Sequence, residues 1–424
     1  MKKFLLHLGT ICFLLLFIGQ IKAQETIATR DNVSIDLATL GKESSFGKGW
    51  SYNADTLRIA GVEENDKRFD QYRLEGKSEN LHVIITTSLT PETQENNFPL
   101  TLIAGGTELA WSSADMFALE IEEGVNVTFQ LPETSSVIIK QTNPNRGACI
   151  YNKGNLKIEG TGSFSIESII GTAFYNDRKA SCELVSGSVA CKGDVALYLD
   201  TESSLKFSGE ASLFTTGDLG IYSNALFDVS KGTLRSFGMK KELSTAIIEN
   251  SDAQLVGSLL QFTSNLEAPI EGVTLQLIPE DATMDTISID LPEKVISFAL
   301  NVAPGSYKLV KPGTPNITEQ GENESEETVT LFVAKDGQLV SYINVQPEST
   351  MTNNVVVKDE PVPIVRASNG VIHVALQKRA TVFVYNYGGT LMRSMQLPAG
   401  DAEISVGKGN YIVRIGSISY KVAL

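Results

Sequence analysis

A pattern of apolar positions returns every 22–26 residues in the middle third of the chain. Each copy of this triplet, which we call the refrain, places a small residue beside a large apolar residue, and in four of the five copies a tyrosine follows. The copies are Cys149-Ile150-Tyr151, Ala173-Phe174-Tyr175, Ala196-Leu197-Tyr198, Gly220-Ile221-Tyr222 and Ala246-Ile247-Ile248. The four tyrosines are 24, 23 and 24 residues apart. A fixed period of this length is typical of a solenoid, in which each repeat forms one coil stacked on the previous coil.

Two further short strands are predicted in each coil. One alternates apolar and polar residues and ends at a glycine, in residues 156–160, 182–187, 205–209, 227–232 and 254–257. The other carries a short apolar element, at Phe164/Ile166, Val189/Cys191, Leu213, Leu234/Phe237 and Leu259/Phe262. Three strands per coil predict a right-handed parallel β-helix over residues 111–265. In such a fold the coils stack about 4.8 Å apart and their inward side chains build one continuous core.

The remaining regions also read as β structure, because helical periodicity is scarce. Residues 24–110 are expected to form an N-terminal cap and the first coils, since an open end would leave strand edges unpaired. Residues 266–350 predict a separate β-sandwich module, with turn signals at Pro304-Gly305 and Asp336-Gly337. Residues 351–365 read as a linker, and residues 366–424 as a small C-terminal β-sandwich.

The tyrosines are the candidate binding residues of the β-helix. If the middle residue of each triplet points inward, the tyrosines point outward, because neighbouring side chains of a strand alternate in direction. Their rings could then meet the apolar faces of sugar rings, or they could stack on one another and strengthen the coils. Of these two alternatives, we favour stacking of the tyrosine rings on one another. The candidate ligand-binding residues are Tyr151, Tyr175, Tyr198 and Tyr222.

The start of the chain predicts export. Lys2 and Lys3 precede an apolar run from residue 4 to residue 18, and Ala23 offers a small residue for cleavage, so residues 1–23 read as a signal peptide. No later stretch has the length of a transmembrane helix. Signal cleavage would change the charge from 35 − 50 = −15 to 32 − 50 = −18. A surface this acidic argues against nucleic acid as a partner.

The sequence offers few groups for catalysis or metal binding. Only two histidines, His82 and His373, follow the signal peptide, and no histidine lies between residues 83 and 372. The sequence contains no paired CxxC, no adjacent aspartates in the refrain coils and no nucleophile or nucleotide motif. We therefore expect no catalytic residues, no metal and no cofactor. A Cys182–Cys191 disulfide is an open alternative to free, core-filling cysteines.

Two parts of the chain resemble known groups. Residues 147–164, with the earlier Gly49-Trp50-Ser51-Tyr52 segment, resemble β-helical carbohydrate-binding-domain proteins of gut bacteria, which implies glycan binding. The C-terminal block contains residues 380–391 and 404–415 and a last strand that carries Lys421. It resembles the C-terminal sorting domain of the type IX secretion system in Bacteroidetes. That resemblance implies transport across the outer membrane, although Lys421 stands alone where many members have a more basic end.

These observations give one leading hypothesis and two alternatives. The leading hypothesis is an exported, non-enzymatic β-helix that binds a polysaccharide or a surface protein, located outside the cell or on the outer membrane, with the periplasm as the alternative. The second hypothesis is a structural stalk or adhesin that mediates protein contacts. The third is a polysaccharide lyase or hydrolase with unrecognised carboxylates. The type IX secretion machinery is the expected transport partner.

Overall fold

The computed structural model describes residues 29–41, 43–65, 67–89, 98–240, 243, 245–250, 252–264, 274–292, 295–310, 329–331, 335–345, 364–368, 371–376, 379–386, 391–415 and 418–423. The predicted signal peptide and most of the predicted linker lie outside these residues. The described helix content is one 3-10 turn, η1 (Leu37–Thr39), and no described helix is long and apolar enough to cross a membrane. The chain divides into two compact units, residues 1–262 with 266–341 and residues 263–265 with 342–424.

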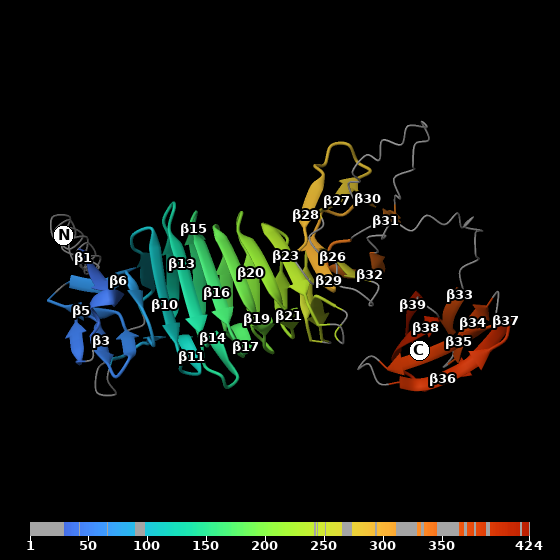
Figure 1. Ribbon diagram of the computed structural model, residues 1–424, viewed down its shortest axis with the longest axis horizontal. Coiled ribbons are helices and arrows are strands. Elements are labelled where there is room, and N and C mark those ends of the chain that lie inside the picture. The colour runs from blue at the N-terminus through green and yellow to red at the C-terminus, as the bar shows by residue number, and fades with distance from the viewer. Residues whose placement is uncertain are drawn as a thin grey trace, which may run out of the picture. The chain divides into compact units, whose positions relative to one another are not determined.

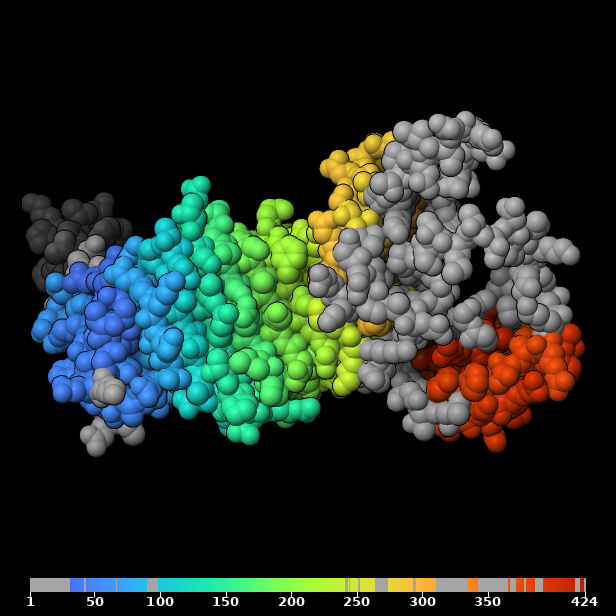
Figure 2. Space-filling model, in the orientation of Figure 1, coloured from blue at the N-terminus to red at the C-terminus, as the bar shows by residue number. Residues whose placement is uncertain are grey.

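One row of parallel strands forms the first sheet of unit 1 (Figure 1). Each strand between the first and the last pairs with the strand one coil earlier and the strand one coil later. Its members are β1 (Thr29–Asp36), β6 (Lys67–Glu75), β9 (Leu100–Ala104), β12 (Asn126–Leu131), β15 (Asn155–Gly160), β18 (Ser181–Leu184), β20 (Ser204–Phe207), β22 (Leu226–Asp228) and β25 (Gln254–Val256). The repeated parallel pairing confirms the predicted parallel β-helix, and the space-filling view shows its coils as one continuous body (Figure 2).

The second sheet contains two rows of parallel strands. The first row holds β7 (Lys77–Ser78), β10 (Glu108–Ser113), β13 (Ser136–Gln141), β16 (Ser163–Ser168) and β23 (Thr233–Gly238). The second holds β4 (Thr56–Ile59), β8 (His82–Ile85), β11 (Phe117–Ile121), β14 (Gly147–Asn152), β17 (Gly171–Asn176) and β24 (Ile247–Glu249). The long strands β19 (Ser188–Leu199) and β21 (Ser212–Ser223) run through both rows.

Glycines occupy the corner through which the long strands pass. Gly193 pairs with Gly217, which in turn pairs with Gly238 one coil later. A Cβ atom on Gly217 would overlap the carbonyl oxygen of Gly193. Only glycine fits at this position, because the backbones of neighbouring coils approach each other too closely for a side chain.

In the core of unit 1, the buried residues that occupy the same position in successive coils form columns. Ile150, Phe174, Leu197 and Ile221 are paired in sequence order, and each is at most 1% exposed. The middle residue of each refrain triplet therefore points inward, as predicted from the alternation of side chains along a strand. Each coil covers the apolar side of its neighbour, which is why a single coil would be unstable alone.

The three described cysteines are core-filling residues without disulfides. Cys149, Cys182 and Cys191 are all buried and free. Cys182 lies on β18 in the first sheet and Cys191 on β19 in the second sheet. Of the two alternatives that the sequence left open, the structure shows free thiols and not a Cys182–Cys191 disulfide. The thiols act here as small apolar groups.

The N-terminal cap is built of short antiparallel strands. β2 (Ser45–Gly47) pairs with β3 (Trp50–Asn53), and β3 pairs with β4, which begins the parallel row. On the other sheet, β5 (Val62–Glu64) pairs antiparallel with β6. These short strands pair part of the strand edge that the first coil presents.

The segment after the last coil differs from the predicted separate module. β27 (Thr274–Pro279), β28 (Ile287–Asp290), β30 (Tyr307–Val310) and β31 (Val329–Leu331) form a four-stranded antiparallel sheet. However, β29 (Ser297–Asn301) pairs antiparallel with β23 and joins the solenoid sheet. Asn301 also accepts a hydrogen bond from the Leu234 amide. The segment thus shares a compact unit with the β-helix, because β29 pairs the strand edge that the last coils would otherwise expose. Two more strands are β26 (Ser258–Ser264) and β32 (Gln338–Val345).

Unit 2 consists of two small antiparallel sheets around their own core. The first contains β33 (Ile364–Ser368), β34 (Val371–Leu376) and β37 (Gly400–Ser405). The second contains β36 (Leu391–Leu397), β35 (Ala380–Asn386), β38 (Asn410–Ile415) and β39 (Ile418–Ala423). Val382, Val384 and Val413 are fully buried between them. This agrees with the small β-sandwich predicted for the C-terminal block.

Candidate functional site

The four refrain tyrosines lie in one column on the second row of the second sheet. Tyr151 pairs with Tyr175, Tyr175 with Tyr198, and Tyr198 with Tyr222. Each side chain is partly exposed, in contrast to its buried neighbours in the strand. Ile248 continues the column after Tyr222, where the fifth refrain copy lacks a tyrosine. The structure therefore brings all four candidate residues together, and we call them the tyrosine column.

The rings of the tyrosine column stack mainly on one another. The centres of the Tyr175 and Tyr198 rings are 4.7 Å apart with planes 8° from parallel, and those of Tyr198 and Tyr222 are 4.9 Å apart at 13°. Phe117 stacks on Tyr151 at 4.6 Å. Tyr151 and Tyr175 meet edge to face instead, at 5.5 Å and 63°. Because stacked neighbours cover the ring faces, the column offers ring edges and hydroxyl groups to a ligand.

Polar residues at the ends of the strands bind the tyrosine hydroxyl groups of the neighbouring coil. The Tyr151 hydroxyl donates to Asp177 Oδ2 at 2.6 Å, and the Tyr175 hydroxyl donates to Asp200 Oδ2 at 2.8 Å. Asn250 Nδ2 donates to the Tyr222 hydroxyl at 2.6 Å. Burial, followed by the hydrogen bond to a carboxylate, raises the pKa of Tyr151 and Tyr175 well above its ordinary value. Both tyrosines are therefore neutral hydrogen-bond donors at physiological pH.

Two buried asparagines fix the strand ends next to the column. Asn152 and Asn176 are both 0% exposed, and Asn152 Nδ2 donates to Asn176 Oδ1 at 2.7 Å. The same amide of Asn152 donates to the carbonyl of Ser181 at 3.0 Å, which joins one coil to the start of β18 in the next. Such satisfied buried amides hold neighbouring backbones in place. The sequence signal for this pair is a Tyr-Asn dipeptide that occurs in two successive copies of the refrain, at residues 151–152 and 175–176.

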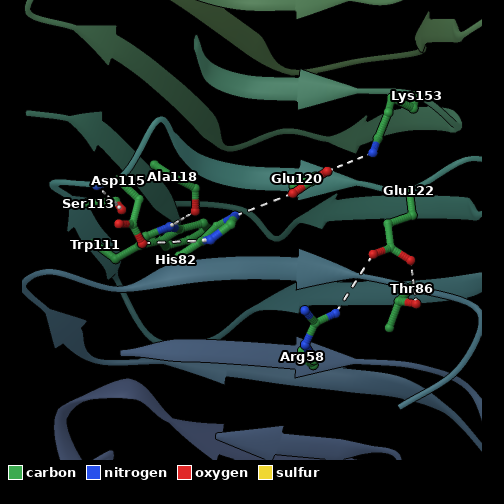
Figure 3. Close-up of polar contacts among 10 residues, drawn as sticks. All are labelled: Arg58, His82, Thr86, Trp111, Ser113, Asp115, Ala118, Glu120, Glu122 and Lys153. Carbon is green, nitrogen blue, oxygen red and sulfur yellow. Dashed lines mark hydrogen bonds and ion pairs between the residues drawn. The ribbon is translucent and has the colours of Figure 1, made fainter. Parts of the chain in front are cut away.

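A charged cluster lies at the N-terminal end of the column, and Figure 3 shows its ion pairs. Glu120 pairs with Tyr151 and takes the tyrosine position in its own coil. Lys153 Nζ lies 2.7 Å from Glu120 Oε1 and 5.4 Å from the centre of the Tyr151 ring. Arg58 lies 3.7 Å from Glu122, whose other oxygen accepts a hydrogen bond from Thr86 at 2.6 Å. We call these residues, with His82 and Asp115, the charged end.

His82 is the one imidazole of the charged end. Its Nε2 atom lies 3.7 Å from Glu120 Oε2, and its Nδ1 atom lies 3.8 Å from Asp115 Oδ2. Burial lowers the pKa of His82, although Glu120 and Asp115 counteract this effect and Arg58 adds to it. The imidazole is therefore neutral at physiological pH. No group of three histidine, cysteine or carboxylate side chains in the described part of the chain is arranged to hold a metal ion.

A shallow hollow opens beside the junction of the charged end and the tyrosine column. Its volume is about 300 Å³, and Glu123, Lys153, Asp177, Arg178 and Lys179 line it. Asp177 also binds the Tyr151 hydroxyl, so the hollow adjoins the place where the ring stack turns edge to face. Sequence reasoning missed the hollow, because the lining residues come from turns rather than from the refrain.

Comparisons with known proteins assign no family. No protein-family model matches the chain, and no curated protein matches it significantly. A DUF3823 family protein from Bacteroides ovatus is 14% identical, covering 39% of this chain and 98% of that chain, with a TM-score of 0.15. A DUF3823 family protein from Parabacteroides merdae is also 14% identical, covering 38% and 90%, with a TM-score of 0.16. The Bacillus anthracis TIE protein is 17% identical, covering 42% of this chain and 33% of that chain, at 0.15. At TM-scores this low, the likenesses assign neither a fold nor a function to this chain.

Proposed function

We propose that the protein is an exported, non-enzymatic β-helix that binds a glycan along the tyrosine column. The observation that carries this proposal is a hydrogen-bonding pair that repeats on two successive coils. Tyr151 with Asp177, and Tyr175 with Asp200, present the same hydroxyl–carboxylate pair on successive coils. A ladder with a period of about 4.8 Å suits an extended polymer whose own groups repeat along its length.

The expected binding mode is hydrogen bonding to ring edges and hydroxyl groups. Stacked neighbours occupy the faces of Tyr198, at 4.7 Å and 4.9 Å, so a sugar ring cannot lie flat on it without opening the stack. The neutral tyrosine hydroxyls and the carboxylates of Asp177 and Asp200 provide polar groups for sugar hydroxyls instead. The resemblance of residues 147–164 to carbohydrate-binding β-helices supports the same class of ligand.

A structural stalk is the second candidate function, and the mutual stacking of the tyrosines favours it. In that case the column would stabilise the coils, and no ligand would be needed to explain its regularity. The two functions differ in whether the tyrosine hydroxyls affect any binding. A change that removes the hydroxyl and keeps the ring therefore separates them.

The test is polysaccharide binding by the full mature chain and by the double variant Tyr151→Phe/Tyr175→Phe. Removing two hydroxyl groups that would hydrogen-bond to the sugar is expected to weaken binding at least tenfold, since about 1.4 kcal/mol corresponds to a factor of ten. The matched control is Tyr52→Phe, which removes a tyrosine hydroxyl that contacts Asp55 in the N-terminal cap. Binding that is equal in both variants, or no binding to any polysaccharide, would leave the stalk as the better account.

Export to the cell surface is part of the proposal. It is supported by the signal-peptide pattern of residues 1–23 and by the resemblance of the C-terminal block to sorting domains of the type IX secretion system. The test is fractionation of cells that express the full chain or a chain ending before residue 366. Surface exposure that depends on residues 366–424 is expected. Equal periplasmic retention of both chains would contradict it.

A further inference from the structure

We infer that the hollow lined by Glu123, Lys153, Asp177, Arg178 and Lys179 is a subsite for one sugar unit of an uncharged glycan. The inference rests on the proposed glycan-binding function and adds both a position and a ligand class to it. The observations that carry it are the place of the hollow, the groups that line it and the charge around it.

The hollow lies where a polymer that follows the tyrosine column would meet the charged end. Asp177 lines the hollow and also binds the hydroxyl of Tyr151. Lys153 lines it and lies over the ring of Tyr151. A volume of about 300 Å³ is at the lower limit of the usual range for small-molecule sites, so the space suits one small unit of a chain.

Some of the lining groups are already paired and others are open. Lys153 pairs with Glu120 at 2.7 Å, and Arg178 pairs with Glu202 at 2.5 Å. By contrast, the side chains of Glu123 and Lys179 form no hydrogen bond or close ion pair with a described residue, although Lys179 adds to the effect of Arg178 in lowering the pKa of Glu202. A carboxylate accepts hydrogen bonds and an ammonium group donates them, so together they suit hydroxyl groups, which do both.

The charge around the hollow disfavours an acidic glycan. Two acids and three bases line the hollow, and Glu120 and Glu202 adjoin it as ion-pair partners. This gives three positive groups against four negative groups, on a chain with a formal charge of −15. A uronate or sulfate group would meet no net positive potential there, whereas a neutral sugar pays no electrostatic penalty.

The first experiment measures binding of soluble polysaccharides to the full mature chain carrying Glu123→Gln and Lys179→Asn. Asparagine is chosen because Lys179 has a φ of 65°, a backbone conformation that asparagine tolerates. The control pair is Lys206→Asn, at an exposed position in β20, and Glu210→Gln, at an exposed position in the bend that follows β20. We expect the hollow variant to bind about tenfold more weakly than the control variant, a change of about 1.4 kcal/mol. Equal binding by the two variants would overturn the subsite.

The second experiment compares uncharged and acidic polysaccharides at low and high salt. An uncharged polymer is expected to bind most tightly, with little change in affinity when the salt is raised, because no charge on the ligand is screened. Tightest binding to an acidic polymer at low salt would overturn the inference while leaving the proposed function intact. Binding that falls in Tyr151→Phe/Tyr175→Phe but not in the hollow variant would do the same. Absence of binding to every polymer would overturn both.

Discussion

The same position of the coil carries charged groups in two of the early coils and aromatic groups in the later ones. Arg58, the buried Ile84 and Glu120 are paired in register before Tyr151 and Tyr175. The backbone ladder and the inward core residues are alike in both regions. The solenoid therefore fixes where a side chain stands, and the residue at that position decides its chemistry.

The two regions also differ in how their outward side chains are held. In the tyrosine column each ring contacts the rings one coil away, so the groups support one another along the axis. In the charged end the contacts are individual ion pairs, such as Lys153 with Glu120, and both of these side chains are partly exposed. Exposed ion pairs contribute little to stability, about 0–1 kcal/mol each. We expect the aromatic region to be the more stable of the two.

The largest effect is expected in the shared core. Phe174→Ala would remove a ring that is 1% exposed and should lower the free energy of unfolding by about 3–5 kcal/mol. Val83→Ala is the corresponding change beneath the charged end, where Val83 is 0% exposed. Fewer atoms are lost there, so the expected cost is smaller, about 2 kcal/mol. Urea denaturation measures both, and a larger cost for Val83→Ala would contradict a continuous core.

The asparagine pair should give the next largest effect. Asn152→Leu would remove the donor to Asn176 and to the carbonyl of Ser181, and should cost about 1–3 kcal/mol. The double variant Asn152→Leu/Asn176→Leu should cost less than the sum of the two single changes, because it leaves fewer unpaired groups. Leu199 already occupies the paired position in the next coil. Strict additivity in the denaturation data would argue against energetic coupling between the two amides.

Substitutions of outward-pointing side chains should change the free energy of unfolding by smaller amounts, and these amounts should differ between the tyrosine column and the charged end. Tyr198→Ala would remove two ring contacts, each worth about 0.5–1.5 kcal/mol beyond area burial. Tyr198→Phe keeps both rings and should be close to neutral. Glu120→Ala, in the charged end, should cost at most about 1 kcal/mol, and the cost should shrink in high salt. Thermal denaturation at two salt concentrations tests this ranking, which a larger cost for Glu120→Ala would reverse.

The smallest effect concerns pH. The pKa of His82 is lowered from 6.5 by burial, so the unfolded chain binds a proton at a higher pH than the folded chain. The His82 contribution to stability is therefore constant above pH 6.5 and becomes unfavourable as the pH falls below it. We expect His82→Gln to reduce the loss of stability on acidification below pH 6.5. An unchanged or steeper loss in the variant, measured by thermal denaturation across pH, would contradict this sign.

The sequence predicted the fold and the column because both follow from one period. Tyrosines 23 or 24 residues apart had to become neighbours once the coils were in register. The stacking of the rings was expected, but the edge-to-face contact between Tyr151 and Tyr175 could not be predicted, because it depends on side-chain rotamers and on Phe117, which lies outside the refrain. Glu120 was missed because its coil has no tyrosine to mark the position.

The other omissions have a similar cause. The hollow depends on turns whose length varies between coils, so its lining residues, such as Lys179, have no fixed spacing in the sequence. The pairing of β29 with β23 joins residues more than fifty positions apart, and no local pattern encodes that contact. Periodic features were therefore predictable, whereas contacts made by turns and by the last strands were not.

The most direct test of the account is cysteine cross-linking within the tyrosine column. Tyr175→Cys with Tyr198→Cys would place two thiols on paired residues of adjacent strands, about 4.8 Å apart, which is within the range for a disulfide. Tyr175→Cys with Tyr222→Cys would separate them by two strands, about 9.6 Å, which is too far. Rapid oxidation of the first pair and none of the second is the expected result under mild oxidant. Equal oxidation of both pairs, or none of the first, would contradict the stacking on which the proposed glycan-binding face depends.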